Sequence, residues 1–353
     1  MSSMFGEKIR VSIFGQSHSA AIGVTIDGLP AGFRPDMDAI SAFMARRAPG
    51  KSEFATARKE ADQFEILSGM ADGVFCGAPF AAVIRNTSQR SSDYAPFRDT
   101  PRPGHADYTA RVRYANFQDA SGGGHFSGRL TAPLCLAGAI CMQILEQQGV
   151  KIGAHILQIG TAFDRRFDPM APELGSILPG TLPVLEASAA EEMGGVIREA
   201  KEEGDSVGGV IEVGVTGFPA GIGDPMFDGI ENRIAQIVFG VPAVKGLEFG
   251  SGFDCASMRG SDHNDAYVLR SGRIETATNH HGGILGGISS GMPIVFRAAI
   301  KPTPSIFKPQ RSVDLKNMTE TELTIAGRHD PCIVPRAVPV LEAAAAIALA
   351  DML

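Results

Sequence analysis

The segment 101–131, PRPGHADYTARVRYANFQDASGGGHFSGRLT, carries the residue types that handle an anion. It combines two histidines, several arginines and a run of three glycines, and it leads through a serine into an apolar stretch. The first backbone N–H groups of a helix have no partner inside the helix, and the helix dipole favours negative charge there. A cation-rich segment that enters a helix through a glycine loop therefore predicts a binding site for an anionic molecule.

His105 is a candidate for proton transfer, within the sequence RPGHAD. Pro103 and Gly104 restrict the backbone before it. Arg102 supplies a planar cation suited to a carboxylate or a phosphate, and Asp107 is spaced to orient the imidazole. The alternative is a histidine that only caps the following helix, and the pattern alone supports the two interpretations equally.

Ser127 and Arg129 belong to the glycine loop GGGHFSGR. Ser127 is the expected N-cap of a helix over 128–148. The alternative is a flexible turn with an ordinary serine cap. Because a cation is unfavourable in the first turn of a helix, Arg129 favours an anion bound between the arginine and the helix.

Two further segments contain residues for proton transfer and phosphate binding. His18 lies in the polar turn GQSHS between two expected strands, where it would transfer protons near neutral pH. On its own, a turn histidine that bonds to its own loop is the favoured interpretation. Lys301, Thr303 and Ser305 stand within five residues on a proline-stiffened loop, KPTPS, and form a credible clamp for a monophosphate.

Two motifs have weaker interpretations. Arg328 and Asp330 lie two residues apart in GRHDP, which suits an anion contact and a proton acceptor, or else a surface salt bridge. His280 and His281 are adjacent, and adjacent side chains of a strand point to opposite faces. We therefore expect no metal site at this pair.

The composition limits the function classes. The net charge of −7 and the absence of a basic tract exclude recruitment of nucleic acid or an anionic membrane, and local basic clusters favour a small polyanionic ligand. No apolar run reaches the roughly 20 residues that span a bilayer, and the start of the chain lacks a signal-peptide core. The scattered, odd-numbered cysteines indicate reduced thiols in a cytoplasmic protein, without a zinc site.

The expected elements mix strands and helices without strict alternation, and no nucleotide-binding glycine motif follows the first strand. The apolar helix over 128–148 is expected to be central and buried. The length of 353 residues fits two domains or one large domain. Strands are expected at 8–14, 22–26, 64–67, 80–85, 150–159, 207–218, 244–249 and 293–300, and helices at 37–47, 106–114, 128–148, 185–203, 227–239 and 338–352.

From end to end, the chain resembles the chorismate synthase family. The matching stretches, in order, are GQSHS…DGLPAG, RRAPGKS, EILSG, RNTSQRSSDY, RPGHADYTAR, GGGHFSGR, AVKGLEFGSGF, NHHGGILGGISSGMPI, KPT and GRHDPCIVPRAVPVLEA. Ten such stretches in one order make the match specific.

The resemblance implies a reaction, a cofactor and a fold. The reaction is the anti-1,4-elimination of phosphate from 5-enolpyruvylshikimate 3-phosphate, which gives chorismate, with reduced FMN and no net redox change. The hydrogen that is lost sits on an unactivated carbon, so a reduced flavin that lends electron density is needed beside the acids and bases of the protein. The implied fold is a single α+β domain over 1–353, a β-α-β sandwich of antiparallel sheets around central helices, assembled as a homotetramer. NADPH or an external flavin reductase would supply the reducing equivalents.

The resemblance also assigns roles by position. His105 would protonate the departing phosphate, His18 would protonate the flavin, and Asp330 would manage the proton at flavin N5. The substrate anions would be held by Arg47, Arg102 and Arg129. The FMN site would be lined by His125, Ser127, Ala243, Gly286, Lys301, Thr303, Ser305 and Arg328.

Several positions depart from the family pattern. Glu53 replaces a substrate-side arginine, His125 and Phe126 replace an arginine and a serine, and Pro242 replaces an asparagine. Fewer cations weaken the binding of a polyanion. Two alternatives therefore stay open, a diverged FMN-dependent paralogue that acts on a related, less charged substrate, and a non-catalytic FMN-binding relative.

Overall fold

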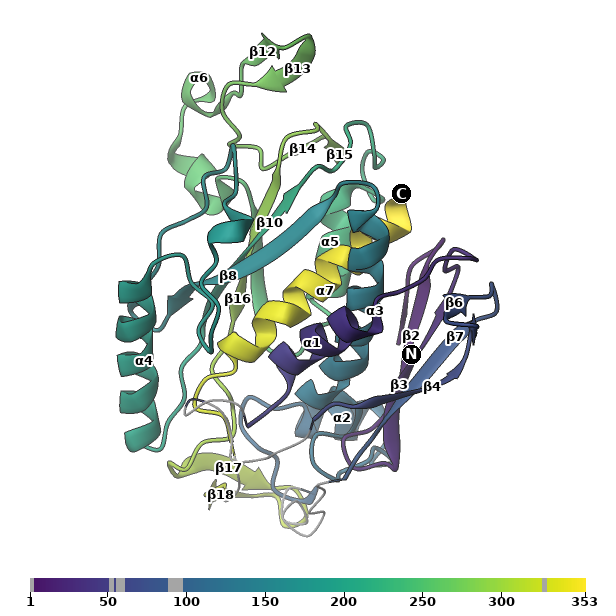
Figure 1. Cartoon of the computed structure of the whole chain (residues 1–353). Coiled ribbons are helices and arrows are strands. Elements are labelled where there is room, and N and C mark those ends of the chain that lie inside the picture. Colours follow the sequence, from purple (N-terminus) through teal and green to yellow (C-terminus); the bar gives the residue numbers. More distant parts are fainter. Residues whose placement is uncertain (1–2, 51–53, 55–60, 88–97, 326–328) are drawn as a thin grey trace.

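The computed structural model describes residues 3–50, 54, 61–87, 98–325 and 329–353, and Figure 1 shows their arrangement. Two five-stranded sheets form the framework, and every strand pair in them is antiparallel. In spatial order, the first sheet contains β1 (Met4–Phe5), β2 (Arg10–Gly15), β3 (Ala21–Asp27), β7 (Phe80–Arg85) and β4 (Phe64–Ser68). The second contains β11 (Val244–Phe249), β16 (Ile294–Ile300), β10 (Gly209–Thr216), β8 (Lys151–Ile159) and β9 (Ala162–Phe163).

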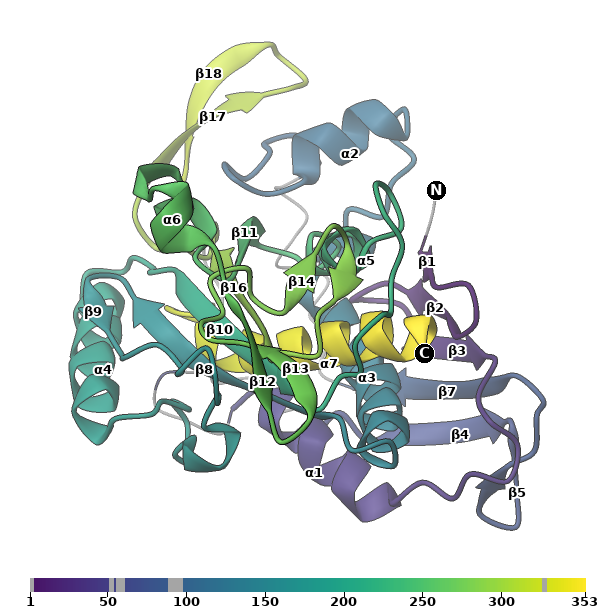
Figure 2. The ribbon, with the colours of Figure 1, turned by 90° about the horizontal axis from the view of Figure 1, so that it is seen from above.

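Three helices lie between the two sheets, as Figure 2 shows from above. They are α1 (Met37–Arg47), α3 (Thr131–Glu146) and α7 (Val334–Met352). The backbones of α3 and α7 approach so closely that a Cβ added to Gly138 would lie 2.2 Å from the Cβ of Ala343. Only glycine fits at this crossing. Buried side chains of both sheets and of all three helices join in one hydrophobic core.

The remaining helices cover the edges and ends of this framework. α5 (Ile230–Val238) packs on α7, and α4 (Ala187–Glu202) packs on β8 and β9. α2 (Asp107–Arg113) follows the loop that carries His105, and α6 (Gly260–His263) is a single turn.

The expected helices and strands are confirmed, with shifts at their ends. Asp36 caps α1, because its carboxylate accepts hydrogen bonds from the backbone of Asp38 and Ala39. The expected helix over 128–148 begins as a 3₁₀ turn, Gly128–Leu130, before α3. α7 begins at Val334, four residues before the expected start. Pro335 lies in its first turn, where a proline removes no intrahelical hydrogen bond, so the helix can start before it.

The described residues also form four short hairpins that were not predicted from the sequence. They pair β5 (Met70–Ala71) with β6 (Val74–Phe75), β12 (Tyr267–Arg270) with β13 (Arg273–Thr276), β14 (Ile284–Leu285) with β15 (Ile288–Ser289), and β17 (Gln310–Asp314) with β18 (Thr319–Leu323).

The stretch Gly128–Glu146 has the length and apolarity of a membrane span, but 78% of its most apolar window is buried inside the protein. It is the core helix of the sandwiched layer rather than a surface that faces lipid. The described residues include no other helix with this length and apolarity.

Candidate active site

The RPGHAD loop forms a compact charged unit around Asp107. The guanidinium of Arg102 donates to both oxygens of Asp107, each at 2.7 Å, and Nδ1 of His105 lies 2.7 Å from Oδ1. Burial opposes ionisation of this carboxyl, but the hydrogen bonds and charges of Arg102 and His105 outweigh burial and hold the pKa of Asp107 well below its usual range. Asp107 is therefore a permanent carboxylate that sets the plane of the His105 ring.

The glycine loop joins this unit to His18. Nη2 of Arg102 donates to the backbone oxygen of Gly122 at 2.8 Å. Gly122 has φ +69°, and a Cβ added to it would lie 2.3 Å from Cε1 of His18. Ser17 contacts Nδ1 of His18 through its hydroxyl at 3.0 Å, and its backbone N–H donates to Gly124. The structure thus places His18 on one side of the glycine loop, and Arg102 with its neighbour His105 on the other.

Arg47 and Arg129 form ion pairs with Asp62, one with each carboxylate oxygen. The exposed fractions of the three side chains are 3%, 5% and 0%. The sequence predicts a ligand anion beside Arg129, whereas the structure places a carboxylate of the chain itself there. Asp62 was missed because it lies 67 residues from Arg129 and in none of the motifs that carried the analysis.

Arg336 is a second residue that the sequence analysis did not single out. Its Nη1 donates to Oδ2 of Asp330 at 2.6 Å, and its Nε donates to the backbone oxygen of Arg47 at 3.1 Å. The signal was present in the sequence, since Arg336 follows Asp330 by six residues in the last matching stretch. Arg328, Glu53 and most of the loop 86–104 lie outside the described residues.

The KPTPS loop packs against the RPGHAD loop. Nζ of Lys301 donates to the backbone oxygen of Gly104 at 3.1 Å, and the backbone N–H of Lys301 donates to Ala243 at 2.9 Å. Burial and the nearby charge of Lys245 lower the pKa of Lys301. A negative charge bound at this loop would act in the opposite direction and favour the charged form of Lys301.

Thr303 has a buried hydroxyl with no hydrogen-bond partner among the described residues, and the nearby Ser305 is buried. A buried polar atom without a partner is costly unless a ligand satisfies it. The donor set of lysine, threonine and serine therefore fits a phosphate group.

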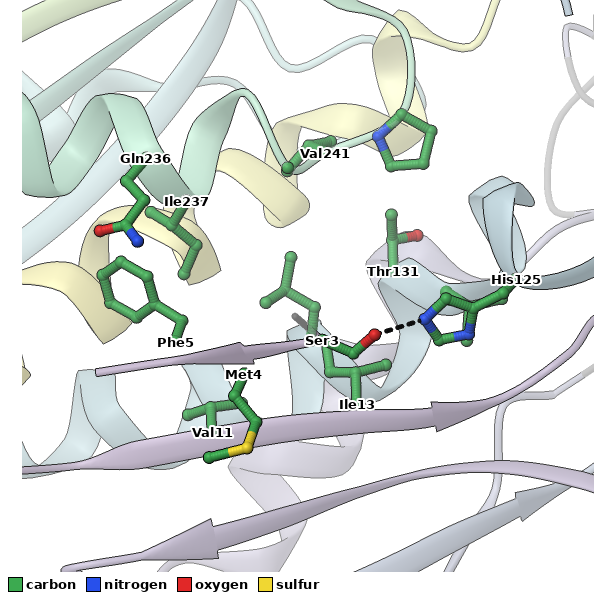
Figure 3. Close-up of a pocket in the computed structure, with 14 residues that line it drawn as sticks. Ser3, Met4, Phe5, Val11, Ile13, His125, Thr131, Gln236, Ile237 and Val241 are labelled. Atoms are coloured by element: carbon green, nitrogen blue, oxygen red, sulfur yellow. Dashed lines mark hydrogen bonds between the residues drawn. The ribbon is translucent and has the colours of Figure 1, made fainter. Parts of the chain in front are cut away.

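The side chains of His125 and Ser127 form hydrogen bonds with other residues of the chain. Nδ1 of His125 lies 2.7 Å from the backbone oxygen of Gly15. Its Nε2 lies 2.8 Å from the hydroxyl of Ser3, and Figure 3 marks this hydrogen bond. The ring lines a mainly apolar cavity of about 370 Å³, which Thr131 and Pro242 also line. Ser127 caps the 3₁₀ turn, as expected, because its hydroxyl accepts from the backbone of Arg129 at 3.2 Å.

Gly286 lies apart from the other candidates. It occupies the turn between β14 and β15, before β16 begins, whereas Lys301 follows the other end of β16. The seven residues of β16 separate these two ends by about 23 Å. A single chain therefore does not bring Gly286 to the KPTPS loop.

The two adjacent histidines correct one expectation. They lie in a turn rather than in a strand, and Nδ1 of both His280 and His281 contacts the carboxylate of Asp265. The prediction that they point to opposite faces was therefore wrong. Within the part of the chain that the structure describes, no group of three or more potential ligands has the arrangement of a metal site.

The fold and the site define an α+β enzyme of small-molecule metabolism, with histidines and arginines held around a glycine loop. Comparison with known proteins gives the particular family. The family model for chorismate synthase matches residues 9–353. The chorismate synthase of Lancefieldella parvula is 47% identical over 100% of this chain and 96% of its own length. That of Korarchaeum cryptofilum is 45% identical over 99% of this chain and 96% of its own.

A solved structure described as a crystal structure of chorismate synthase superimposes with a TM-score of 0.77. It is 30% identical in sequence, and the match covers 98% of this chain and 92% of that one. The chain belongs to the chorismate synthase family, and it is an enzyme of this lyase class.

Proposed function

We propose that the protein eliminates phosphate from 5-enolpyruvylshikimate 3-phosphate in the anti-1,4 sense to give chorismate, with reduced FMN as the cofactor. The observation that carries the proposal is the unit of Arg102, His105 and Asp107, packed through Gly122 against His18. A guanidinium beside an oriented imidazole supports this proposal, because the expulsion of phosphate needs a proton donor and a positive charge close together.

In this proposal, the site residues have separate roles in proton transfer and in substrate binding. Nε2 of His105 would face the departing phosphate and give it a proton, because Nδ1 is turned toward Asp107. His18 would give a proton to the flavin, and Asp330 would accept one from it. Arg336 holds the Asp330 carboxylate in place. Arg47, Arg102 and Arg129 hold the substrate anions.

The KPTPS loop would hold the phosphate of FMN, through Lys301, Thr303 and Ser305. When bound, the reduced flavin supplies electron density to the reacting carbon framework and takes it back. The backbone of Ala243 has φ +76°, and its carbonyl oxygen accepts a hydrogen bond from the backbone N–H of Lys301. Strained residues of this kind persist where a binding site over-determines them. His125, Ser127 and Arg328 are also proposed for the cofactor. Gly286 is proposed with them, but because it lies at the other end of β16 it would have to come from a neighbouring subunit of the homotetramer.

The other implied properties belong to the same proposal. The chain would act as one β-α-β sandwich domain over 1–353, supported by the single core between its two large sheets. It would work in the cytoplasm as a homotetramer, and NADPH or an external flavin reductase would reduce the flavin.

The decisive experiment is an anaerobic assay of the purified protein with reduced FMN and 5-enolpyruvylshikimate 3-phosphate. We expect chorismate and inorganic phosphate in equal amounts. No product with fully reduced flavin and saturating substrate would overturn the proposal.

The paralogue remains the second candidate because Phe126, which replaces a polar residue of the family pattern, is 42% exposed beside the glycine loop. Turnover of a less charged analogue in the same assay, without turnover of 5-enolpyruvylshikimate 3-phosphate, would favour it.

A further inference from the structure

Asp62 is the shared counter-ion of two arginines that come from distant parts of the chain. Arg47 ends α1, and Arg129 lies in the 3₁₀ turn before α3, yet both contact the Asp62 carboxylate. The carboxylate is fully buried. Removing one partner of a buried ion pair leaves an uncompensated charge, so the three groups depend on one another for their positions.

Arg336 adds a third cation to this group. Among the described residues it pairs with Asp330, while Arg47 and Arg129 share Asp62. Burial and the charge of Arg47 lower the pKa of Arg336, while Asp330 and Asp62 act in the opposite direction. The five groups therefore form one electrostatic cluster.

The backbone of Asp62 is also strained. Its φ of +50° lies in the left-handed region, which residues other than glycine seldom adopt. Such a conformation persists only where the surroundings hold it, and here two guanidiniums hold the side chain.

A chain of hydrogen bonds connects this cluster to the turn that carries His18. Nε of Arg129 donates to Oδ1 of Asn86 at 3.2 Å. The amide nitrogen of Asn86 donates in turn to the backbone oxygens of Gln16 at 3.1 Å and Ser19 at 2.8 Å, on either side of His18. A shift of Arg129 would therefore be transmitted to the histidine turn.

We infer that Asp62 is a positioning residue for substrate binding, which holds Arg47 and Arg129 in fixed orientations. This inference rests on the proposed function. Asp62 acts through the arginines and takes no part in proton transfer.

The test is the Asp62→Asn variant, which keeps the shape of the side chain and removes its charge. We expect the KM for 5-enolpyruvylshikimate 3-phosphate to rise at least about tenfold, because the two guanidiniums repel each other and lose their orientation. We expect kcat to fall by less than about threefold and the Kd of FMN to stay within about twofold. An unchanged KM in a folded variant would overturn the inference.

Two further variants keep the test decisive. Asp62→Glu retains the charge on a longer side chain, so it should fold where Asp62→Asn does not, with a raised KM and nearly normal kcat. If Asp62→Glu also leaves KM unchanged, Asp62 has no positioning role. Asp164→Asn is the matched control, because Asp164 is an equally buried aspartate that pairs with His155 near the second sheet. It should lower stability and leave KM unchanged.

Calorimetric titration of the same substrate into wild type and variants separates this inference from the proposed function. Wild type that binds the substrate without turnover refutes the proposed reaction, while a weakened Kd in Asp62→Asn still supports the role of Asp62. Wild type that turns over, with equal Kd values in the two proteins, refutes the role of Asp62 alone. Wild type that does not bind the substrate refutes both.

Discussion

Nδ1 of His105 lies 2.7 Å from Oδ1 of Asp107, and the same oxygen accepts from Arg102. One carboxylate thus orients both the imidazole and the guanidinium of the loop. Asp107 remains ionised throughout the physiological range, because hydrogen bonds and charges from its two partners hold its pKa down despite burial. The ring of His105 is therefore directed by a fixed charge rather than by a titrating one.

Replacing Asp107 with asparagine should lower kcat by about 10- to 100-fold, because the ring loses its fixed tautomer and Arg102 loses its partner. The Kd of FMN should change little, since the KPTPS loop does not use Asp107. Steady-state kinetics and a flavin titration measure the two effects.

Replacing His105 with alanine should lower kcat at least as much as Asp107→Asn does, while the Kd of FMN stays nearly unchanged. An equal loss of kcat and of FMN affinity would mean that the loop is only structural.

A methyl group at Gly122 should damage the site directly. In Gly122→Ala the new Cβ would lie 2.3 Å from Cε1 of His18, and the φ of +69° is unfavourable for alanine. We expect kcat to fall by about 100-fold and the free energy of unfolding by about 1–3 kcal/mol. Gly128→Ala is the control from the same loop, because a Cβ there meets no atom within 4 Å. Equal kinetics in the two variants would show that His18 is not held by the glycine loop.

Local patterns made much of this architecture predictable from the sequence. The cap at Asp36 and the helix that it starts depend on hydrogen bonds within three residues, so the pattern contains them. The central helix was recognisable because its side chains are apolar all round. The short hairpin β12–β13 was not, because its exposed Leu269 and Ile274 give no alternation between buried and polar positions.

The candidate site was predictable only where its residues lie in one motif. The unit of Arg102, His105 and Asp107 spans six residues, and the contact of Asp107 with His105 was predicted from the sequence. The pairing of Arg102 with Asp107 was not, because Arg102 was expected to bind a ligand anion. The pairing of Asp62 with Arg47 and Arg129 crosses 15 and 67 residues, so no spacing in the sequence indicates it. The separation of Gly286 from Lys301 was not predictable either. It arises because β16 lies between the two residues and keeps them at its opposite ends.

The hydroxyl of Thr303 should matter for the cofactor and not for the fold. Thr303→Val removes a buried hydroxyl that has no partner among the described residues, so the stability of the protein without FMN should stay equal or rise slightly. The Kd of FMN should rise by about tenfold or more, because a hydrogen bond to a charged phosphate is lost. Fluorescence titration measures the Kd. Thr319→Val, at an exposed position of β18, is the control, and an unchanged FMN affinity in Thr303→Val would remove this residue from the clamp.

Asp351, at the end of α7, should make stability depend on acid pH. Its Oδ1 accepts from the backbone of Glu7, Lys8 and Ile9, and its other oxygen pairs with Arg233. Burial opposes ionisation, but these donors outweigh it and lower the pKa of Asp351. The stabilisation is therefore present above the unfolded pKa of about 3.9 and is lost as the pH falls through the lower folded value. Asp351→Asn should cost about 2 kcal/mol at neutral pH, and in urea unfolding the gap to wild type should narrow between about pH 5 and about pH 2. Asp27→Asn, at an exposed position, should show no such gap, and a gap for Asp351→Asn that stays constant with pH would mean that its charge does not stabilise the fold.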